Sequence, residues 1–195
     1  MDIMTNSKIL ISWIIIGRNW ANTIKKLVDS LNNQAFDSKL IELIIIDDAS
    51  SDNSIEHLKD IEFENKKIIK LDKQSGRCVA RNTGIKIAEG EYCLFTNSNI
   101  IPENNFLEQY INTLSQSTSD GAAGVIQYSC LDTSFEKYLN HEKRGLKQYR
   151  AGDLLPIKHI LFANCAIKTS LIQNVDGFNE KLTGYGGEEI ELLDR

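Results

Sequence analysis

The sequence contains only two prolines and four cysteines among its 195 residues. Pro102 and Pro156 are too few to mark a proline-rich linker, and no repeat or low-complexity tract divides the chain. The cysteines are widely separated, and no C-x-x-C pair indicates zinc or redox chemistry. We therefore expect one domain over residues 1–195 with reduced cysteines, of which Cys93 and Cys165 lie in apolar segments as small core residues.

The sequence also lacks a long apolar run and an excess of basic residues. Residues 9–16 are far too few to span a membrane, and residues 1–8 show neither a basic leader nor a small-residue cleavage site. We expect a cytoplasmic protein, with contact at the inner face of the membrane as an open alternative. A net charge of −5 argues against a nucleic-acid-binding surface.

Basic residues are scattered except at 141–150, HEKRGLKQYR. This segment is interpreted as a solvated loop, with contact to an anionic acceptor or a membrane surface as the alternative.

In the first half of the chain, apolar runs alternate with helical patterns. Ile24, Leu27, Val28 and Leu31, for example, follow the i, i+3, i+4, i+7 spacing of a helix face. We predict strands at 9–16, 43–46, 67–71 and 92–96, and helices around 24–31, 55–61 and 77–88, the last stopped by Gly90. This alternation predicts an α/β fold with a mostly parallel sheet between two layers of helices.

The second half is predicted to complete the same layers. Pro102 is expected to open a helix whose apolar face contains Phe106, Leu107, Tyr110, Ile111 and Leu114. Further strands are predicted at 122–128 and 160–168, a turn at 176–178, and a helix beginning near residue 188.

Two adjacent carboxylates, Asp47 and Asp48, end the buried run LIII at 43–46. Ligands of open α/β sheets bind outside the carboxyl ends of the strands, so a binding crevice is expected there. The alternative is that Asp48 and the segment from Ser50 to Ser54 only cap the next helix, since Asp and Ser side chains accept hydrogen bonds from free helix N–H groups.

Four segments in order resemble the landmarks of family 2 glycosyltransferases of GT-A fold. They are ISWIIIGRN, IIIDDASSDNS, ARNTGIKIAEGEYCLFTNSN and GFNEKLTGYGGEE. The resemblance covers nearly the whole chain and implies a GT-A domain with a nucleotide-sugar-binding half at 1–100 and an acceptor half at 101–195. It also implies inverting transfer from a UDP-sugar, which could be N-acetylated, to a glycan in cell-surface polysaccharide synthesis.

The resemblance assigns the nucleotide to four places in the first half. Asp48 would accept the imide N–H of uracil, and Gly17 and Asn19 would line the same pocket. Arg77 and Arg81 would pair with phosphate oxygens, because a guanidinium presents a fixed fork of donors. An ordinary exposed helix face is the alternative for both arginines.

The aspartates that usually hold Mn²⁺ or Mg²⁺ in this family are replaced here by Asn97, Ser98 and Asn99. These residues are still expected beside the donor. Hard divalent cations prefer anionic oxygen, so we expect any metal binding at Asn97 and Asn99 to be weak. His141 and His159 are the nearest other candidates, although a lone histidine is more often structural.

The resemblance places acceptor and base at the C-terminal GYGGEE motif, residues 184–189. Glu189 would take the acceptor proton, while Glu188, Gly186, Gly187 and, further back, Asn164 would contact the acceptor. The alternative is that Glu188, Glu189 and Glu191 only supply favourable charge at a helix N-terminus.

A second function remains open at this point. Without metal aspartates, the chain could be a non-catalytic nucleotide-sugar-binding protein or a partner subunit with the same fold. The absence of a Ser-His-Asp or Cys-His pattern agrees with a single base and no protein nucleophile. Residue 195 falls inside the helix expected after Glu189, which is compatible with a longer chain.

Overall fold

The computed structural model describes residues 8–116, 118–184 and 186–195 and contains one six-stranded sheet. The strands are β1 (Ile11–Gly17), β2 (Ile41–Asp47), β3 (Lys66–Lys70), β4 (Tyr92–Asn97), β5 (Gly121–Ala123) and β6 (Asn164–Lys168). Their order is β3-β2-β1-β4-β6-β5. The first four are parallel, and β6 is antiparallel to both β4 and β5. The predicted α/β fold with a mostly parallel sheet is therefore confirmed.

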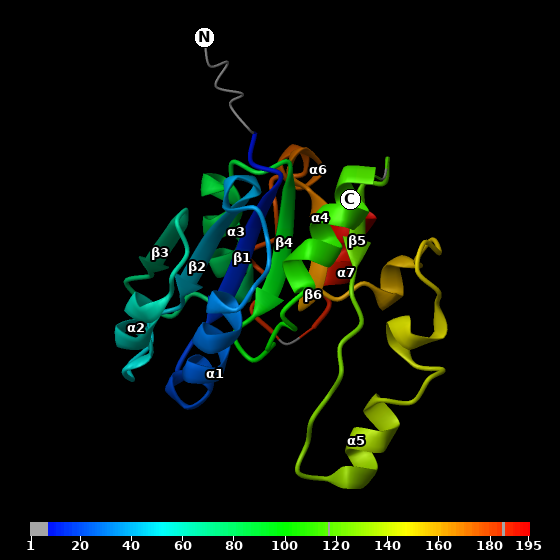
Figure 1. The fold of residues 1–195 in the computed structure, drawn as a ribbon, viewed down its shortest axis with the longest axis horizontal. Coiled ribbons are helices and arrows are strands. Elements are labelled where there is room, and N and C mark those ends of the chain that lie inside the picture. The colour runs from blue at the N-terminus through cyan, green and yellow to red at the C-terminus, as the bar shows by residue number, and fades with distance from the viewer. Residues whose placement is uncertain (1–7, 117, 185) are drawn as a thin grey trace.

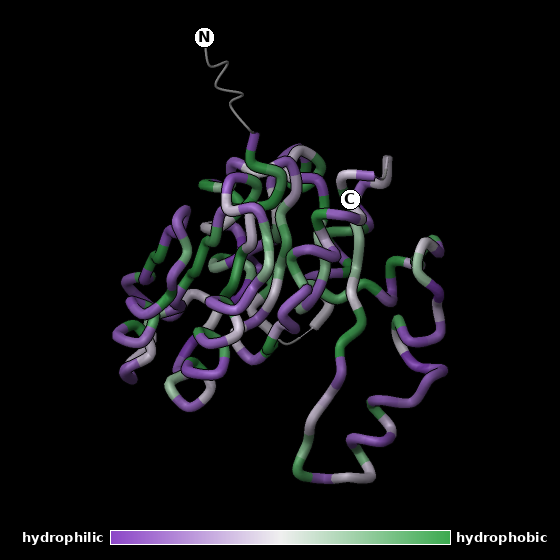
Figure 2. The backbone as a smooth tube through the Cα atoms, viewed as in Figure 1, coloured by the Kyte–Doolittle hydropathy of each residue, from purple (hydrophilic) through white to green (hydrophobic). Residues whose placement is uncertain are grey.

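Helices cover both faces of this sheet (Figure 1). They are α1 (Ala21–Asn32), α2 (Ser54–His57), α3 (Arg77–Ile87), α4 (Phe106–Gln116), α5 (Thr133–Leu139), α6 (Thr169–Asn174) and α7 (Glu188–Asp194). Apolar side chains of α1 and α4 pack in one core cluster, and those of α3, α6 and α7 pack in the other. The four apolar residues of the predicted α1 face are all buried, as their spacing indicates. Figure 2 shows the apolar residues running along the central strands.

Three predicted boundaries in the second half are wrong. The helix expected from Pro102 begins at Phe106, after a turn. The strand expected at 122–128 ends at Ala123, and the one expected at 160–168 begins at Asn164. The two strands stop pairing at the same place, where Gly124 N donates to Asn164 O at 3.0 Å. Beyond that bond neither segment has a partner strand in the described part of the chain, so residues 124–128 and 160–163 form no β-ladder.

Gly90 has a different role from the helix stop that we predicted. The helix α3 ends at Ile87, and Ala88 after it is extended. A Cβ on Gly90 would lie 2.5 Å from the backbone nitrogen of Ser12 in β1. Glycine is needed at this position because two backbones approach each other closely.

The segment between β5 and β6 extends away from the sheet and carries α5 (Figures 1 and 2). No residue of α5 is buried. Residues 141–150, the basic stretch, are mostly exposed and include a short 3-10 turn at Gly145–Gln148.

The four cysteines are free, and three of them, Cys78, Cys93 and Cys165, are buried. Burial raises the pKa of the Cys93 thiol to about 12. The thiol is therefore protonated at neutral pH and behaves as a small core residue. Among the residues described, no helix is both long and apolar enough to cross a membrane.

Candidate functional site

The carboxyl ends of β1, β2 and β4 meet at one edge of the sheet. Gly17 is paired in register with Asp47, and Ile16 is paired with Asn97. A Cβ on Gly17 would lie 2.6 Å from the Cβ of Ser98. The structure thus brings the predicted residues Gly17 and Ser98 into contact, and only glycine allows the loop after β4 to come so close.

The loops that follow β1 and β2 are tied to each other by side-chain hydrogen bonds. Ser50 Oγ accepts from the backbone N–H of Asn19 at 2.9 Å, and Asn19 Oδ1 accepts from that of Ser51 at 2.9 Å. Ser54 Oγ accepts from Trp20 N at 2.9 Å. The interpretation of these serines as caps of the next helix is wrong, because α2 has no side-chain cap. They hold two loops together at the predicted pocket.

Asp47 is fully buried and belongs to the same connection. Its carboxylate accepts from the indole N–H of Trp20 at 3.2 Å and from the backbone N–H of Ser50 at 2.8 Å. We did not predict this role for the first aspartate of the pair. The alternating pattern of the strand contains the signal, since residues 47 and 48 must point to opposite faces.

Asp48 joins the end of β2 to the beginning of α3. Its two oxygens accept from the backbone N–H groups of Ser75, at 2.6 Å, and Gly76, at 3.0 Å. Gly76 has φ of 88° and precedes α3 as its N-cap. The alternative that Asp48 caps α2 is therefore wrong. Asp48 binds the loop before α3, and α3 lies on the other side of the sheet from α2. Each carboxylate oxygen has a second lone pair that can accept from a ligand.

The arginines of α3 pair with the two glutamates of α7. Arg81 lies 3.3 Å from Glu188 Oε1 and 3.3 Å from Glu189 Oε1, and Arg77 lies 3.1 Å from Glu188 Oε1. The Arg81 side chain is only 1% exposed. The prediction that Arg81 pairs with phosphate is therefore not supported by its position, and the exposed helix face is equally wrong for this residue.

Aromatic rings and burial shape the electrostatics of this cluster. The Arg81 guanidinium lies over the rings of Phe162, at 5.6 Å, and Phe178, at 5.1 Å. Burial raises the pKa of Glu189, and the opposing charge of Arg81 only partly offsets this effect. Burial also lowers the pKa of Arg81, although a guanidinium remains charged at neutral pH. A carboxylate with a raised pKa is better suited to accept a proton.

Glu188 and Glu189 differ in accessibility. The Glu188 side chain is 3% exposed, and its Oε2 has no hydrogen-bond partner among the residues described. The Glu189 side chain is 20% exposed. The predicted contact of Glu188 with an acceptor does not fit this burial, because two arginines hold its other oxygen inside the protein. Glu189 is the member of the pair that solvent reaches.

The glycines before α7 provide a sharp entry into the helix. Gly186 and Gly187 have φ of 87° and 90°, and Gly187 is the N-cap of α7. Such angles are strained for residues with a side chain. Tyr185 of the same motif lies outside the described residues. The two glycines place Glu188 and Glu189 in the first turn of α7.

Asn164 does not face an open crevice. Its side chain is buried, its Oδ1 accepts from the Tyr110 hydroxyl at 2.9 Å, and its Nδ2 donates to Val125 O at 3.2 Å. The expected contact of Asn164 with the acceptor is at odds with these bonds, since they occupy both ends of the amide. It holds the middle of α4 against the beginning of β6.

The residues after β4 do not make a divalent-cation site. Asn97 Oδ1 is buried without a hydrogen-bond partner in the described part of the chain, whereas Asn99 is exposed. No group of three or more His, Cys, Asp or Glu side chains there could hold a metal. His159 instead shares a 2.9 Å hydrogen bond with the Tyr149 hydroxyl, and His141 accepts from Lys143 N. Neutral amides alone suit Mn²⁺ or Mg²⁺ poorly.

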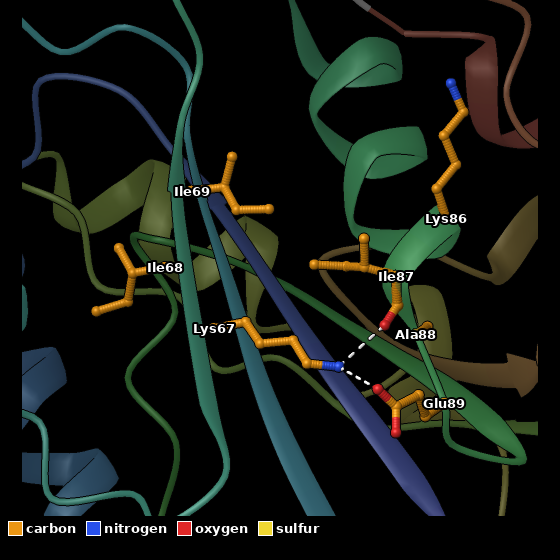
Figure 3. Close-up of a pocket in the computed structure, with 7 residues that line it drawn as sticks. All are labelled: Lys67, Ile68, Ile69, Lys86, Ile87, Ala88 and Glu89. Carbon is orange, nitrogen blue, oxygen red and sulfur yellow. Dashed lines mark hydrogen bonds and ion pairs between the residues drawn. The ribbon is translucent and has the colours of Figure 1, made fainter.

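A groove lies between the edge strand β3 and the end of α3. It is lined by Lys67, Ile68, Ile69, Lys86, Ile87, Ala88 and Glu89 (Figure 3). Lys67 pairs there with Glu89 at 2.6 Å and with the buried Glu42 at 2.8 Å. Sequence reasoning missed this ion pair, although a glutamate inside the apolar strand β2 was a visible signal. None of the predicted site residues lines this groove.

Comparison with known proteins identifies relatives of similar sequence. Glycosyltransferase AglE of Haloferax volcanii is 26% identical over 149 residues, which are 74% of this chain and 49% of that protein. Poly(ribitol-phosphate) beta-glucosyltransferase of Bacillus spizizenii is 34% identical over 120 residues, which are 60% of this chain and 19% of that protein. The chain thus spans half or less of the length of these relatives.

A solved structure has the same fold. TarS 1–349 of S. aureus in complex with UDP superimposes with a TM-score of 0.76 at 22% identity, covering 94% of this chain and 54% of that one. The glycosyl transferase family 2 model matches residues 12–175. This match begins within β1, includes β2, β3 and β4, and ends before α7. The chain belongs to glycosyl transferase family 2 and has the GT-A fold.

Proposed function

We propose that the chain is the GT-A domain of an inverting glycosyltransferase that uses a UDP-sugar and transfers the sugar to a hydroxyl of a glycan acceptor. The observation that carries the proposal is the Glu189 side chain, which is 20% exposed, is held by Arg81 at the first turn of α7, and has a raised pKa. A buried carboxylate with this property is suited to take a proton.

The reaction needs one base. The acceptor oxygen attacks the anomeric carbon, the bond from that carbon to the diphosphate oxygen breaks, and the hydroxyl proton moves to Glu189. One displacement inverts the configuration, and no protein nucleophile is required. The second carboxylate, Glu188, is paired with Arg77 and Arg81 and takes no part in the proton transfer.

We place the uracil ring at Asp48, beside Gly17 and Asn19. Asp48 is held by Ser75 N and Gly76 N, so its orientation does not depend on the ligand. A preoriented carboxylate is a good acceptor for the imide N–H, because little conformational entropy is lost on binding. TarS, a neighbour with the same fold, was solved with UDP, which supports this donor class.

A divalent metal enters no step of this proposal. When bound, such a metal would neutralise charge on the leaving diphosphate. The side chains of Asn97 and Asn99 are neutral, and Ser98 adds only a hydroxyl, so these three residues would contact the donor through hydrogen bonds. We propose that the acceptor is a cell-surface glycan and that the protein works in the cytoplasm or against the inner face of the membrane.

The neutral residues after β4 also favour a second candidate function. Without charge compensation for the diphosphate, the domain would bind the nucleotide sugar and not turn it over. Both candidates share the Asp48 pocket, and they differ in whether Glu189 receives a proton.

One experiment separates these candidates. Titration calorimetry with UDP, UDP-glucose, UDP-galactose and their N-acetyl forms, with and without Mn²⁺, identifies the donors that bind. Transfer is then measured with those donors and a panel of acceptor oligosaccharides. Turnover with a donor that binds supports the enzyme. Binding with no turnover against every acceptor supports the non-catalytic protein, and no binding of any UDP compound contradicts both.

A further inference from the structure

Arg81 is a charged side chain that is almost completely buried. It is 1% exposed, comes from the middle of α3, and reaches two carboxylates on α7, more than a hundred residues later in the chain. An ion pair buried in this way contributes little net stability, because desolvation opposes the attraction. The burial of Arg81 is therefore better explained by the groups that it holds in place.

We infer that Arg81 is a positioning residue: it orients the Glu189 carboxylate and sets the charge that this carboxylate carries. The inference rests on the proposed function of Glu189 as the base. Arg81 itself is too buried to touch an acceptor.

The geometry supports this division of roles. Rings of Phe162 and Phe178 lie against the guanidinium, so its plane cannot turn freely. One arm of the guanidinium contacts Glu188 and the other contacts Glu189 Oε1. A planar fork that is fixed in this way holds Glu189 Oε1 in one place. Arg77 contacts Glu188 from the solvent side and gives the pair a second positive charge.

Several charged and titratable groups surround Glu189. Arg77 and Arg81 of α3, Glu188 of α7 and Cys165 of β6 interact with it electrostatically. The 3-10 turn that carries Lys158 and His159 lies against α7. Burial raises the pKa of Glu189 most, Arg81 lowers it, and Glu188 raises it. Removal of Arg81 should therefore raise this pKa further, and removal of the Glu188 charge should lower it.

The test measures the Glu189 pKa directly and does not need turnover. Carboxyl carbon signals of ¹³C-glutamate-labelled protein are titrated by NMR, and the Glu189 signal is assigned with Glu189→Gln. We expect Arg81→Met to raise the pKa by at least about one unit, the size of shift that a lost neighbouring charge produces. Glu188→Gln should shift it in the opposite direction. If Arg81 had only a structural role, these two variants would not shift the Glu189 pKa in opposite directions.

Arg77→Met is the matched control, because Arg77 contacts Glu188, is 32% exposed, and lowers the Glu189 pKa less than Arg81 does. Its shift should be clearly smaller than that of Arg81→Met. Arg81→Lys keeps the charge but loses the fork, so the pKa should stay near that of the parent. If transfer is measurable, kcat should fall at least about tenfold for Arg81→Lys with little change in donor KM.

Thermal unfolding of each variant is measured to check that the variant is folded. Arg81→Met leaves Glu188 without one of its partners, so the double variant Arg81→Met with Glu188→Gln is included to remove one charge of each sign. Its Glu189 pKa should lie between those of Arg81→Met and the parent. An unchanged pKa in folded Arg81→Met would overturn the inference, and so would a double variant whose Glu189 pKa equals that of Glu188→Gln alone. Absence of turnover by the parent would contradict the proposed function alone, because the NMR titration still reports on Arg81.

Discussion

The carboxylate of Asp48, at the end of β2, accepts a hydrogen bond of 3.0 Å from the backbone N–H of Gly76, which is the N-cap of α3. The same side chain also accepts from Ser75 N. A residue expected to recognise uracil is thus already part of the protein's own framework. Its substitution should affect both ligand binding and the loop before α3.

Asp48→Asn should weaken UDP binding at least tenfold, since a hydrogen bond to a charged group contributes about 1.5–3 kcal/mol. The amide can accept only on one side, so one of the two backbone bonds is lost and the midpoint of thermal unfolding should fall as well. Calorimetry with UDP and an unfolding scan measure the two effects. Asp72→Asn, an exposed carboxylate shortly before the same loop, is the control for charge alone. Parental UDP affinity in a folded Asp48→Asn protein would refute the assignment.

Replacing both Asn97 and Asn99 with aspartate should create or strengthen binding of Mn²⁺, because carboxylates are its preferred ligands. The unmodified protein should bind Mn²⁺ no more tightly than about millimolar in the absence of nucleotide. Paramagnetic relaxation of water by bound Mn²⁺ measures both affinities. The double change of Asn104 and Asn105 to aspartate adds the same charge at exposed positions and should have no effect. Tight binding by the parent would point to metal ligands other than these.

Glu189→Gln should leave UDP affinity nearly unchanged while transfer falls about a hundredfold to ten-thousandfold, the usual loss for a general base. Glu191→Gln is the matched control, since Glu191 lies on the same helix and pairs with Arg195 at the surface. It should retain transfer. Undiminished transfer by Glu189→Gln would show that another group takes the proton.

The Glu42–Lys67 pair should make stability depend on acid. Burial raises the pKa of Glu42, but hydrogen bonds from Lys67, Ser12 and the backbone of Glu89 outweigh it and lower the pKa below 4.5. A lowered folded pKa means that the stabilisation is complete above pH 4.5 and is lost as the pH falls through the folded pKa.

Urea unfolding between pH 3 and pH 7, taken as roughly the window around these values, tests this dependence. Glu42→Gln should cost about 1–3 kcal/mol at neutral pH and should flatten the loss of stability in acid. Glu62→Gln, on an exposed side chain of the neighbouring loop, should change neither. An equally steep acid dependence in Glu42→Gln would assign the titration to another carboxylate.

Local patterns in the sequence predicted most of the first half of the fold. The apolar runs of β1, β2 and β4 and the helical spacing of α1 depend on residues close in the chain, and such periodicity is visible without a structure. The same patterns placed Gly17, Asp48 and Asn97 at the ends of neighbouring strands. Prediction was poorer at 122–128 and 160–163, because a segment is a strand only where another strand lies beside it.

The sequence by itself therefore determined the family, the α/β layers and the strand ends where the candidate site lies. Tertiary structure decided what each side chain does there. In the folded protein, Asp48 binds the loop before α3, and Asn164 accepts a hydrogen bond from Tyr110. Arg81 is buried against Phe162 and Phe178 and faces Glu188 and Glu189. These contacts join residues that are distant in the chain, so they depend on how helices pack on the sheet and not on any local pattern.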